Sequence, residues 1–330
     1  MDVKLYTRIT EQPADLDRWA VLFDWLAEHD DPRVHFARDM MNAALAPLVP
    51  HSLAALQLRG LSLPGPRVLG PIMSDAHHTL ALWRLGYLHT VQLDAMHAGV
   101  IETSLRKLLA HPSGSLLERL SLRPAPEMSA GLEALTEVPM AGLRELFVGP
   151  YNERAVTSTS VDLEPLWDHV SRLVVLTVRG HRMRLGEVRA PYLERLVLQG
   201  PFEGWPYFPE EGCPRLRELV VDLGVASEAM HSWSDAWLPF ERVTLTSLTL
   251  ENAYGAHGLV GALSMTANVQ SLRKLVLPQS DLADVDVLLG HLAAFENLEV
   301  LKLGVPHPHL DVSSLVEGAS KLGIQVHSQR

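Results

Sequence analysis

The sequence predicts an α/β fold: a solenoid of stacked repeats, shaped as an irregular horseshoe with a parallel sheet on its concave side, preceded by a helical N-terminal cap. Two observations support this fold. A short leucine pattern recurs nine times between residues 88 and 303, and the chain ahead of it shows helical periodicity instead. We therefore expect a cap over residues 1–87. About nine repeats and a terminal capping strand should follow over residues 88–330.

Composition limits the class of protein. The 330-residue chain holds 58 leucines, and 47% of its residues are hydrophobic, which excludes a disordered chain. A single cysteine, Cys213, excludes an internal disulfide framework. The net charge of −11 opposes phosphate neutralisation, so we expect no nucleic-acid partner. The first residues lack the pattern of a secretory signal, and no stretch near them suits a membrane span, so we expect a cytoplasmic protein without membrane contact.

The cap begins with two helical patterns. Apolar residues recur with helical spacing over residues 16–27, which predicts an amphipathic helix. Asp31 followed by Pro32 is typical of a helix start, because proline suits the first helical position. A second apolar stripe with helical spacing then covers residues 34–44. The cap is therefore expected to be mainly helical.

The repeats follow the pattern Leu-x-x-Leu-x-Leu, with valine allowed at the last two apolar positions. Six of the eight steps between successive first leucines span 26 to 30 residues. The last apolar residues alternate with others, as in a strand that buries one face. No single repeat can bury its leucines alone, so neighbours must stack into a parallel sheet. The nine first leucines are Leu88, Leu117, Leu143, Leu173, Leu193, Leu216, Leu245, Leu272 and Leu298.

The segments that return from one strand to the next vary along the chain. Residues 100–110 and 282–292 have helical spacing, with Ser280 as an N-cap of the latter, and residues 258–267 look similar. Residues 322–326 alternate and predict one further strand that closes the solenoid.

The repeat pattern resembles the leucine-rich repeat family, whose unit of 20 to 29 residues combines a strand with a helix or a looser return. The family usually carries Asn or Cys in the turn after the strand, and these positions hold neither here. Glycines such as Gly149, Gly180 and Gly200 follow the strands instead. The departure predicts irregular curvature and turns that are closed by other means.

A second resemblance lies in the cap. Residues 24–33 resemble the small bacterial repeat-companion domain, whose hallmark is a DWLEE-G-DPRGE type run ahead of leucine-rich or other repeats, and residues 83–88 resemble its lead into the first repeat. The resemblance implies a bacterial protein and no particular activity. Trp25 and Arg33 read as a core aromatic and a helix-start arginine, with ligand binding as the alternative. The matching residues are Asp24, Trp25, Leu26, Glu28, Asp31, Pro32 and Arg33, whereas Ala27, Asp30 and Val34 depart.

The residues two, four and six positions beyond each first leucine should line the concave face. This face mixes charges with polar and aliphatic side chains, which favours docking of a protein partner. Strand propensity and solubility would select similar residues, so this interpretation stays open beside the functional one. The candidate partner-binding residues are Arg119, Ser121, Arg123, Glu145, Phe147, Thr177, Arg179, Arg195, Val197, Glu218, Val220 and Asp222.

Aromatic residues gather in residues 202–240, where prolines preclude a helix through the first return segment. Large aromatics are favoured anchors at protein interfaces. Alternatively, a return without a helix needs bulky residues to cover the core. The candidate aromatic patch consists of Phe202, Trp205, Tyr207, Phe208, Trp233 and Trp237.

Chemical motifs are absent from the sequence. It contains no phosphate-binding glycine loop, no HExxH and no GxSxG, so we expect no cofactor, metal or catalytic residue. The leading hypothesis is a non-catalytic protein-interaction scaffold or adaptor. One alternative is an enzyme or enzyme subunit with a site in the N-terminal region or near Cys213, although the position of that cysteine just before a repeat strand favours a turn thiol over a nucleophile. Another is a structural protein that self-associates through a sheet edge or the aromatic patch.

Overall fold

A computed structural model describes residues 8–9, 16–29, 49–50, 78–84, 87–95, 98–110, 114, 116–124, 129–138, 140–150, 160–180, 182–200, 207–209, 211–222, 243–251, 260–261, 263–266, 268–277, 285–303 and 312–328. The fold is α/β with a mostly parallel sheet, as the sequence predicts. The chain divides into two compact units. The first unit comprises Met1–Val161 and Pro165–Leu173, and the second comprises Asp162–Glu164 and Val174–Arg330.

In the part of the first unit that the structure describes, five strands are neighbours in one sheet. In spatial order they are β1 (Val49–Pro50), β2 (His78–Arg84), β3 (Tyr87–Ala95), β4 (Arg119–Pro124) and β5 (Glu145–Val148). β2 runs antiparallel to β1 and β3, whereas β3, β4 and β5 are parallel. The expectation of a helical cap over residues 1–87 was therefore wrong for β2.

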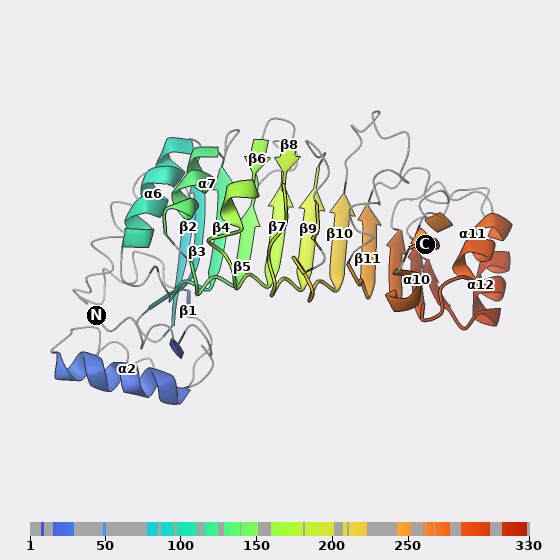
Figure 1. Cartoon of the computed structure of the whole chain (residues 1–330), viewed down its shortest axis with the longest axis horizontal. Coiled ribbons are helices and arrows are strands. Elements are labelled where there is room, and N and C mark those ends of the chain that lie inside the picture. The colour runs from blue at the N-terminus through green and yellow to red at the C-terminus, as the bar shows by residue number, and fades with distance from the viewer. Residues whose placement is uncertain are drawn as a thin grey trace. The chain divides into compact units, whose positions relative to one another are not determined.

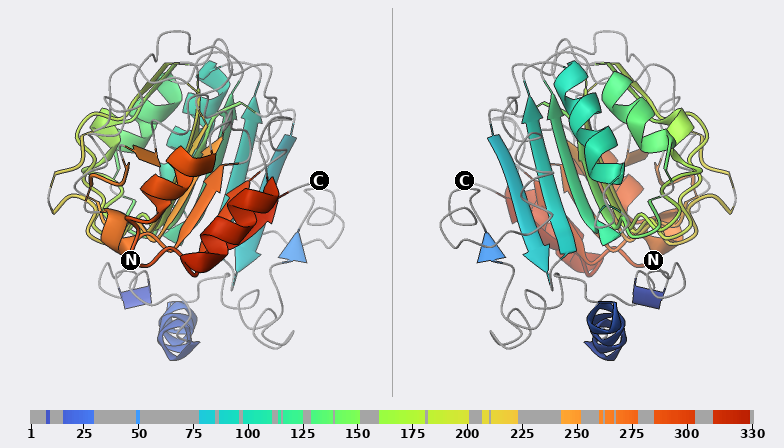
Figure 2. Two further views of the ribbon diagram at one scale, coloured as in Figure 1. Left: turned by 90° about the vertical axis from the view of Figure 1, so that its right-hand side faces the viewer. Right: turned by 90° about the vertical axis from the view of Figure 1, so that its left-hand side faces the viewer.

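Helices of the first unit bury one stripe each. They are α2 (Leu16–Glu28), α6 (Ala98–Ala110) and α7 (Ser129–Thr136). α6 lies along one face of β3 and β4 beside α7 (Figure 2), and it buries Ile101, Leu105 and Leu108. α2 confirms the first predicted helix. Its buried residues form a cluster with two others, and the members are Ile9, Trp19, Leu22, Phe23, Leu26 and Leu116.

Some predictions for the cap fall on residues outside the described ranges. These are the second helical stripe over residues 34–44, Arg33, and the helix start at Asp31 and Pro32. Trp25 is described: its ring stacks on the His29 imidazole, with 4.0 Å between centroids, and it packs at the edge of the α2 cluster. Trp25 is only partly buried, so it lies against the core rather than within it.

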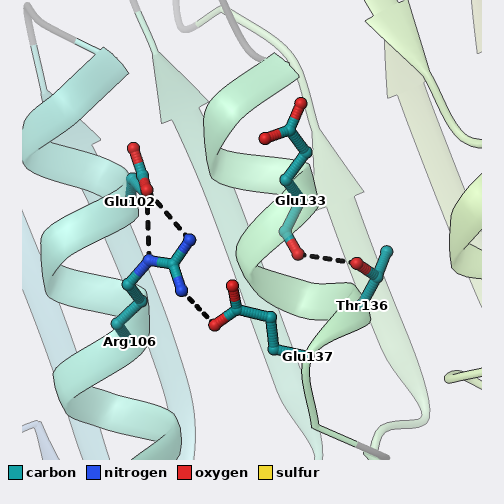
Figure 3. Close-up of polar contacts among 5 residues, drawn as sticks. All are labelled: Glu102, Arg106, Glu133, Thr136 and Glu137. Atoms are coloured by element: carbon teal, nitrogen blue, oxygen red, sulfur yellow. Dashed lines mark hydrogen bonds and ion pairs between the residues drawn. The ribbon is translucent and has the colours of Figure 1, made fainter.

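An arginine joins α6 to α7 at the surface (Figure 3). The Arg106 guanidinium lies 3.0 Å from Glu102 one turn earlier in α6 and also contacts Glu137, just after α7. The hydrogen bonds to Glu137, and then to Glu102, raise the pKa of Arg106. Thr136 Oγ1 donates to the Glu133 carbonyl at 2.7 Å and closes the last turn of α7.

The second unit contains a row of parallel strands (Figure 1). In spatial order they are β7 (Val175–Arg179), β9 (Arg195–Gln199), β10 (Glu218–Asp222), β11 (Ser247–Glu251), β12 (Lys274–Leu277), β13 (Val300–Leu303) and β14 (Gln325–Ser328). Short elements accompany them: β6 (Ser160–Asp162) at the unit boundary, η3 (Glu164–Leu166), β8 (Arg182–Arg184), α10 (Asn268–Ser271), α11 (Val285–Leu292) and α12 (Val312–Lys321). The last two apolar positions of every leucine pattern in the unit lie in a strand.

Leucines stack in register to form the core of the second unit. The middle leucines of successive patterns are Cα partners across the sheet, and each is 0% exposed. Burying one such side chain stabilises the fold by about 1.5–3 kcal/mol. The ladder consists of Leu176, Leu196, Leu219, Leu248, Leu275 and Leu301. The prediction that the leucine patterns fill one continuous interior is confirmed within this unit.

Glycines close the turns after several strands. Gly149 and Gly200 have φ angles of 147° and 114°, a region that other residues rarely adopt. The Gly200 N–H donates to the Asp222 carbonyl at 2.6 Å, and the Gly180 N–H donates to Gln199 at 3.0 Å. The prediction that glycines follow the strands at the turns is confirmed at these positions.

The C-terminal elements differ from the prediction in one detail. α11 confirms the helix predicted over residues 282–292 from Val285 onward, whereas Ser280 lies outside the described residues. The closing strand begins only at Gln325. Gly323, with a φ of 79°, turns the chain between α12 and this strand, so Leu322 ends up exposed rather than in the alternating pattern.

Candidate functional site

The five candidate residues of the first unit meet on one face of β4 and β5. Arg119 Nη2 lies 3.0 Å from Glu145 Oε1, and both side chains are partly exposed. Arg123 places its guanidinium 5.2 Å from the centre of the Phe147 ring and donates from Nε to Ser121 Oγ at 3.1 Å. The face therefore presents an ion pair beside a cation–π pair, an arrangement suited to polar contacts with a partner.

His89 is a buried histidine on β3 that contacts Glu118, the residue just before β4. The sequence pattern does not reveal it. The β2–β3 pairing shifts register between Leu82 and Trp83, whose partners are Thr90 and Leu88, so His89 sits at a bulge. His89 is 7% exposed; its Nδ1 lies 2.8 Å from Thr90 Oγ1, and its Nε2 lies 3.3 Å from Glu118 Oε2. The contacts link β3 to the start of β4. Sequence spacing gives no signal for a bulge.

Three columns of side chains cross the second-unit face, because neighbouring strands are in register. The middle column carries small β-branched residues on β7 and on β9 through β12. We call it the aliphatic stripe, and it consists of Thr177, Val197, Val220, Thr249 and Val276. Four of these residues alternate with the buried leucines and are half-buried, so they lie on the side of the sheet away from the core. Val220 is an exception, because it is only 9% exposed.

Polar and charged columns flank the aliphatic stripe. The column nearer the strand starts holds Val175, Arg195, Glu218, Ser247 and Lys274. The column nearer the strand ends holds Arg179, Gln199, Asp222 and Glu251. Arg195 Nε lies 3.4 Å from Glu218 Oε1, and Arg179 donates to the Gln199 side chain.

The remaining seven candidate residues therefore lie together on the second-unit face. They come from β7, β9 and β10. The face extends further than the candidate set, because the same offsets from the first leucine place Thr249, Glu251, Lys274 and Val276 beside them. The repeat pattern itself carried the signal for these additional positions.

Two members of the candidate aromatic patch lie in the described residues, and they differ in exposure to solvent. Tyr207 is 49% exposed, and its backbone pairs with the segment containing Gly186 and Val188. Phe208 is fully buried and cannot belong to a surface patch; its ring is part of the core instead. Another exposed aromatic, Tyr192, lies under the Arg215 guanidinium at 4.7 Å. Four predicted members lie outside the described residues: Phe202, Trp205, Trp233 and Trp237.

Cys213 occupies the turn that precedes β10. Its carbonyl accepts from the Leu216 N–H at 3.1 Å, as the carbonyls of Val170 and Ala190 accept from the first leucines of their repeats. The thiol is buried and lies 3.7 Å from the Val188 carbonyl oxygen. Burial raises its pKa to about 11, so the unreactive protonated form dominates at neutral pH.

Within the described ranges, no group of three or more His, Cys, Asp or Glu side chains could hold a metal ion. The helices of the described part of the chain are all too short or too polar to cross a membrane.

No family model matches the chain, and no curated protein matches it significantly.

Proposed function

We propose that this chain is a leucine-rich repeat protein with an N-terminal repeat-companion region, and that it acts as a non-catalytic scaffold or adaptor. In this proposal a protein partner docks on the side chains that the strands present away from the core. One observation carries it: in the second unit, identical offsets on successive strands align three columns of side chains on the face opposite the buried leucine ladder, where most members are half-buried and Val220 is buried.

The composition of these columns supports protein docking. Protein interfaces combine an apolar centre with a polar rim. The aliphatic stripe supplies an apolar centre, and the columns that include Arg195, Glu218 and Asp222 supply the rim. In the first unit, Arg123 and Phe147 offer an arginine and an aromatic ring, two residue types enriched at interfaces.

A pull-down from cells of the native organism tests the proposal. The bait pair compares the double change Thr177→Lys and Thr249→Lys, which places charges on the aliphatic stripe, with Val316→Lys, which places a charge on the exposed side of α12. We expect the wild type and Val316→Lys to retain the same partner and the double variant to lose it. Equal recovery by all three folded baits would contradict docking on this face.

A further inference from the structure

We propose that two copies of this chain join through α12 and β14, the last helix and strand of the second unit, around a two-fold axis. The inference goes beyond the proposed function, because it concerns the edge of the sheet rather than the face across β7 to β12. Successive repeats near this edge stack through one helix position and one strand ladder. Both remain partly exposed on α12 and β14.

The helix position is the residue that directly follows a buried apolar side chain. Gly261 follows a buried valine, and a Cβ atom on this glycine would lie 3.0 Å from the ring of His291 in α11. Leu289 follows a buried leucine in α11, and a Cβ atom on Gly318 of the neighbouring α12 would overlap it (Figure 1). Val316 follows a buried leucine in α12 and is 43% exposed. It therefore holds the position through which the two preceding segments contact their successors.

The strand ladder is open at the same edge. Val326 of β14 is the Cα partner of Leu301 and continues the ladder of buried leucines. Each leucine of that ladder is 0% exposed, whereas Val326 is only half-buried. Within the described part of the chain, β14 is the last strand of the row, so its backbone pairs with β13 alone. Such an edge is a template for pairing with another strand.

The lack of charge at this edge favours a second copy as the occupant. A two-fold contact places a surface against itself, so a charge within it would meet its like. β14 contains no Asp, Glu, Lys or Arg, and neither does the strip of α12 formed by Val312, Val316 and Ser320, which recur every four residues. The two charged residues of α12, Glu317 and Lys321, pair with each other at 2.8 Å. Edge strands that face water commonly carry charged side chains instead.

Sheet geometry gives the register of the contact. Around a two-fold axis perpendicular to the sheet, the two β14 strands run antiparallel, and directly opposite residues point to the same face. The core sides of both copies match when Val326 of one lies opposite Val326 of the other. Gln325 then lies opposite His327 of the second copy, on the other face, where both are exposed in the single chain.

Sedimentation velocity over a range of protein concentrations tests the inference on the full chain. We expect the wild type to shift from one copy to two as the concentration rises. Val316→Lys should weaken the dimer about tenfold or more, because it buries two like charges in the contact. Val287→Lys is the matched control and should leave the dimer unchanged, because Val287 is also 43% exposed but lies on α11.

A pair of charge variants tests the register. One variant carries Gln325→Lys and His327→Lys, and the other carries Gln325→Glu and His327→Glu. Like charges lie opposite each other when either variant pairs with itself, so both should dimerise poorly. An equal mixture places opposite charges across the strands, and it should form dimers about tenfold or more tightly than either variant alone.

Several results would overturn the inference. They are a mass of one copy at every concentration, equal weakening by Val316→Lys and Val287→Lys, and no recovery in the mixture of charge variants. Growth beyond two copies would also overturn it, because a two-fold contact closes on itself. If the chain stays monomeric and Val316→Lys loses its partner in the pull-down, a partner covers this edge instead. The baits with Thr177→Lys and Thr249→Lys still judge the proposed function separately.

Discussion

At the scale of single residues, position within the repeat decides the chemistry of Cys213. The turns before Leu173, Leu193 and Leu216 each place one buried residue three positions ahead of the leucine, and in the last of them that residue is a cysteine. The sequence predicts a cysteine next to a strand but not its burial, because burial depends on the neighbouring repeat that covers it. The structure favours a turn thiol over a nucleophile, since the core removes the solvent that would stabilise a thiolate.

Thiol titration checks this environment of Cys213. Native protein should react with a disulfide reagent many-fold more slowly than protein in denaturant, because the buried thiol stays protonated. The folded pKa of about 11 lies above the reference value of 9.0. The folded state therefore favours the protonated thiol more strongly than the unfolded state does. The stability that depends on this protonated thiol is fully present below pH 9 and is lost as the pH rises through 11. Relative to Cys213→Ala, the wild type should lose about 2 kcal/mol of unfolding free energy over that window. Rapid labelling of Cys213 in the native protein would contradict the expected slow reaction of a buried thiol.

Asn268 shows a residue role that the sequence pattern does not reveal. Its side chain is fully buried, and Oδ1 accepts from the Leu245 N–H at 2.9 Å, which ties one repeat to the previous one. Asn268→Ala leaves this buried N–H without its partner, so we expect a loss of about 1–3 kcal/mol in denaturant unfolding. Asn297→Ala is the control, because Asn297 makes a similar bond to the Gln270 carbonyl at the surface. Equal losses in both variants would argue against a special role of burial.

At the scale of elements, α6 is held by its apolar stripe rather than by its ion pairs. Leu105 is 0% exposed, whereas Arg106 lies at the surface between two glutamates. We expect Leu105→Ala to lower the unfolding free energy by about 2–5 kcal/mol. Arg106→Gln should shift the melting temperature far less, because exposed ion pairs are screened by water and salt. A larger shift for Arg106→Gln than for Leu105→Ala would reverse this ranking.

Gly290 and Gly323 together show whether backbone conformation or packing decides the effect of a Gly→Ala change. A Cβ atom would meet nothing within 4 Å at either Gly290 or Gly323, but only Gly323 has a positive φ, of 79°. Gly323→Ala should destabilise the turn before β14 by about 1–2 kcal/mol, because left-handed backbone is strained for alanine. Gly290→Ala should stabilise α11 by about 0.5–1 kcal/mol through helix propensity. Thermal unfolding measures both, and a shift of the same sign would show that φ does not decide the outcome.

The elements that the sequence predicts are those with a strong period. The strands follow from the leucine patterns, and α2 and α6 follow from their apolar stripes, because each pattern reports a single buried face. The sequence does not predict β2. This strand is defined by its antiparallel pairing with β3, and a local sequence pattern does not report which strands pair. The bulge at His89 is not predicted either, because it is also a feature of the β2–β3 pairing.

At the scale of the whole molecule, repetition makes part of the candidate site predictable. Once the first leucine of a repeat is known, fixed offsets place Thr177, Val197 and Val220 on one face. The contacts within a face are less predictable. The Arg119–Glu145 and Arg195–Glu218 pairs depend on strand register, and the burial of Phe208 depends on how its return segment crosses the core.

Stacking also predicts a gradient of stability along the second unit. A strand in the middle of the row is paired on both sides, whereas β14 pairs with β13 alone among the described strands. Terminal repeats therefore open at lower free energy than central ones. In native hydrogen exchange of dilute protein, we expect the amides of β10 and β11 to be protected most strongly and those of β14 least. If β14 is as protected as β10 at high protein concentration and loses that protection on dilution, its edge is covered by a second copy.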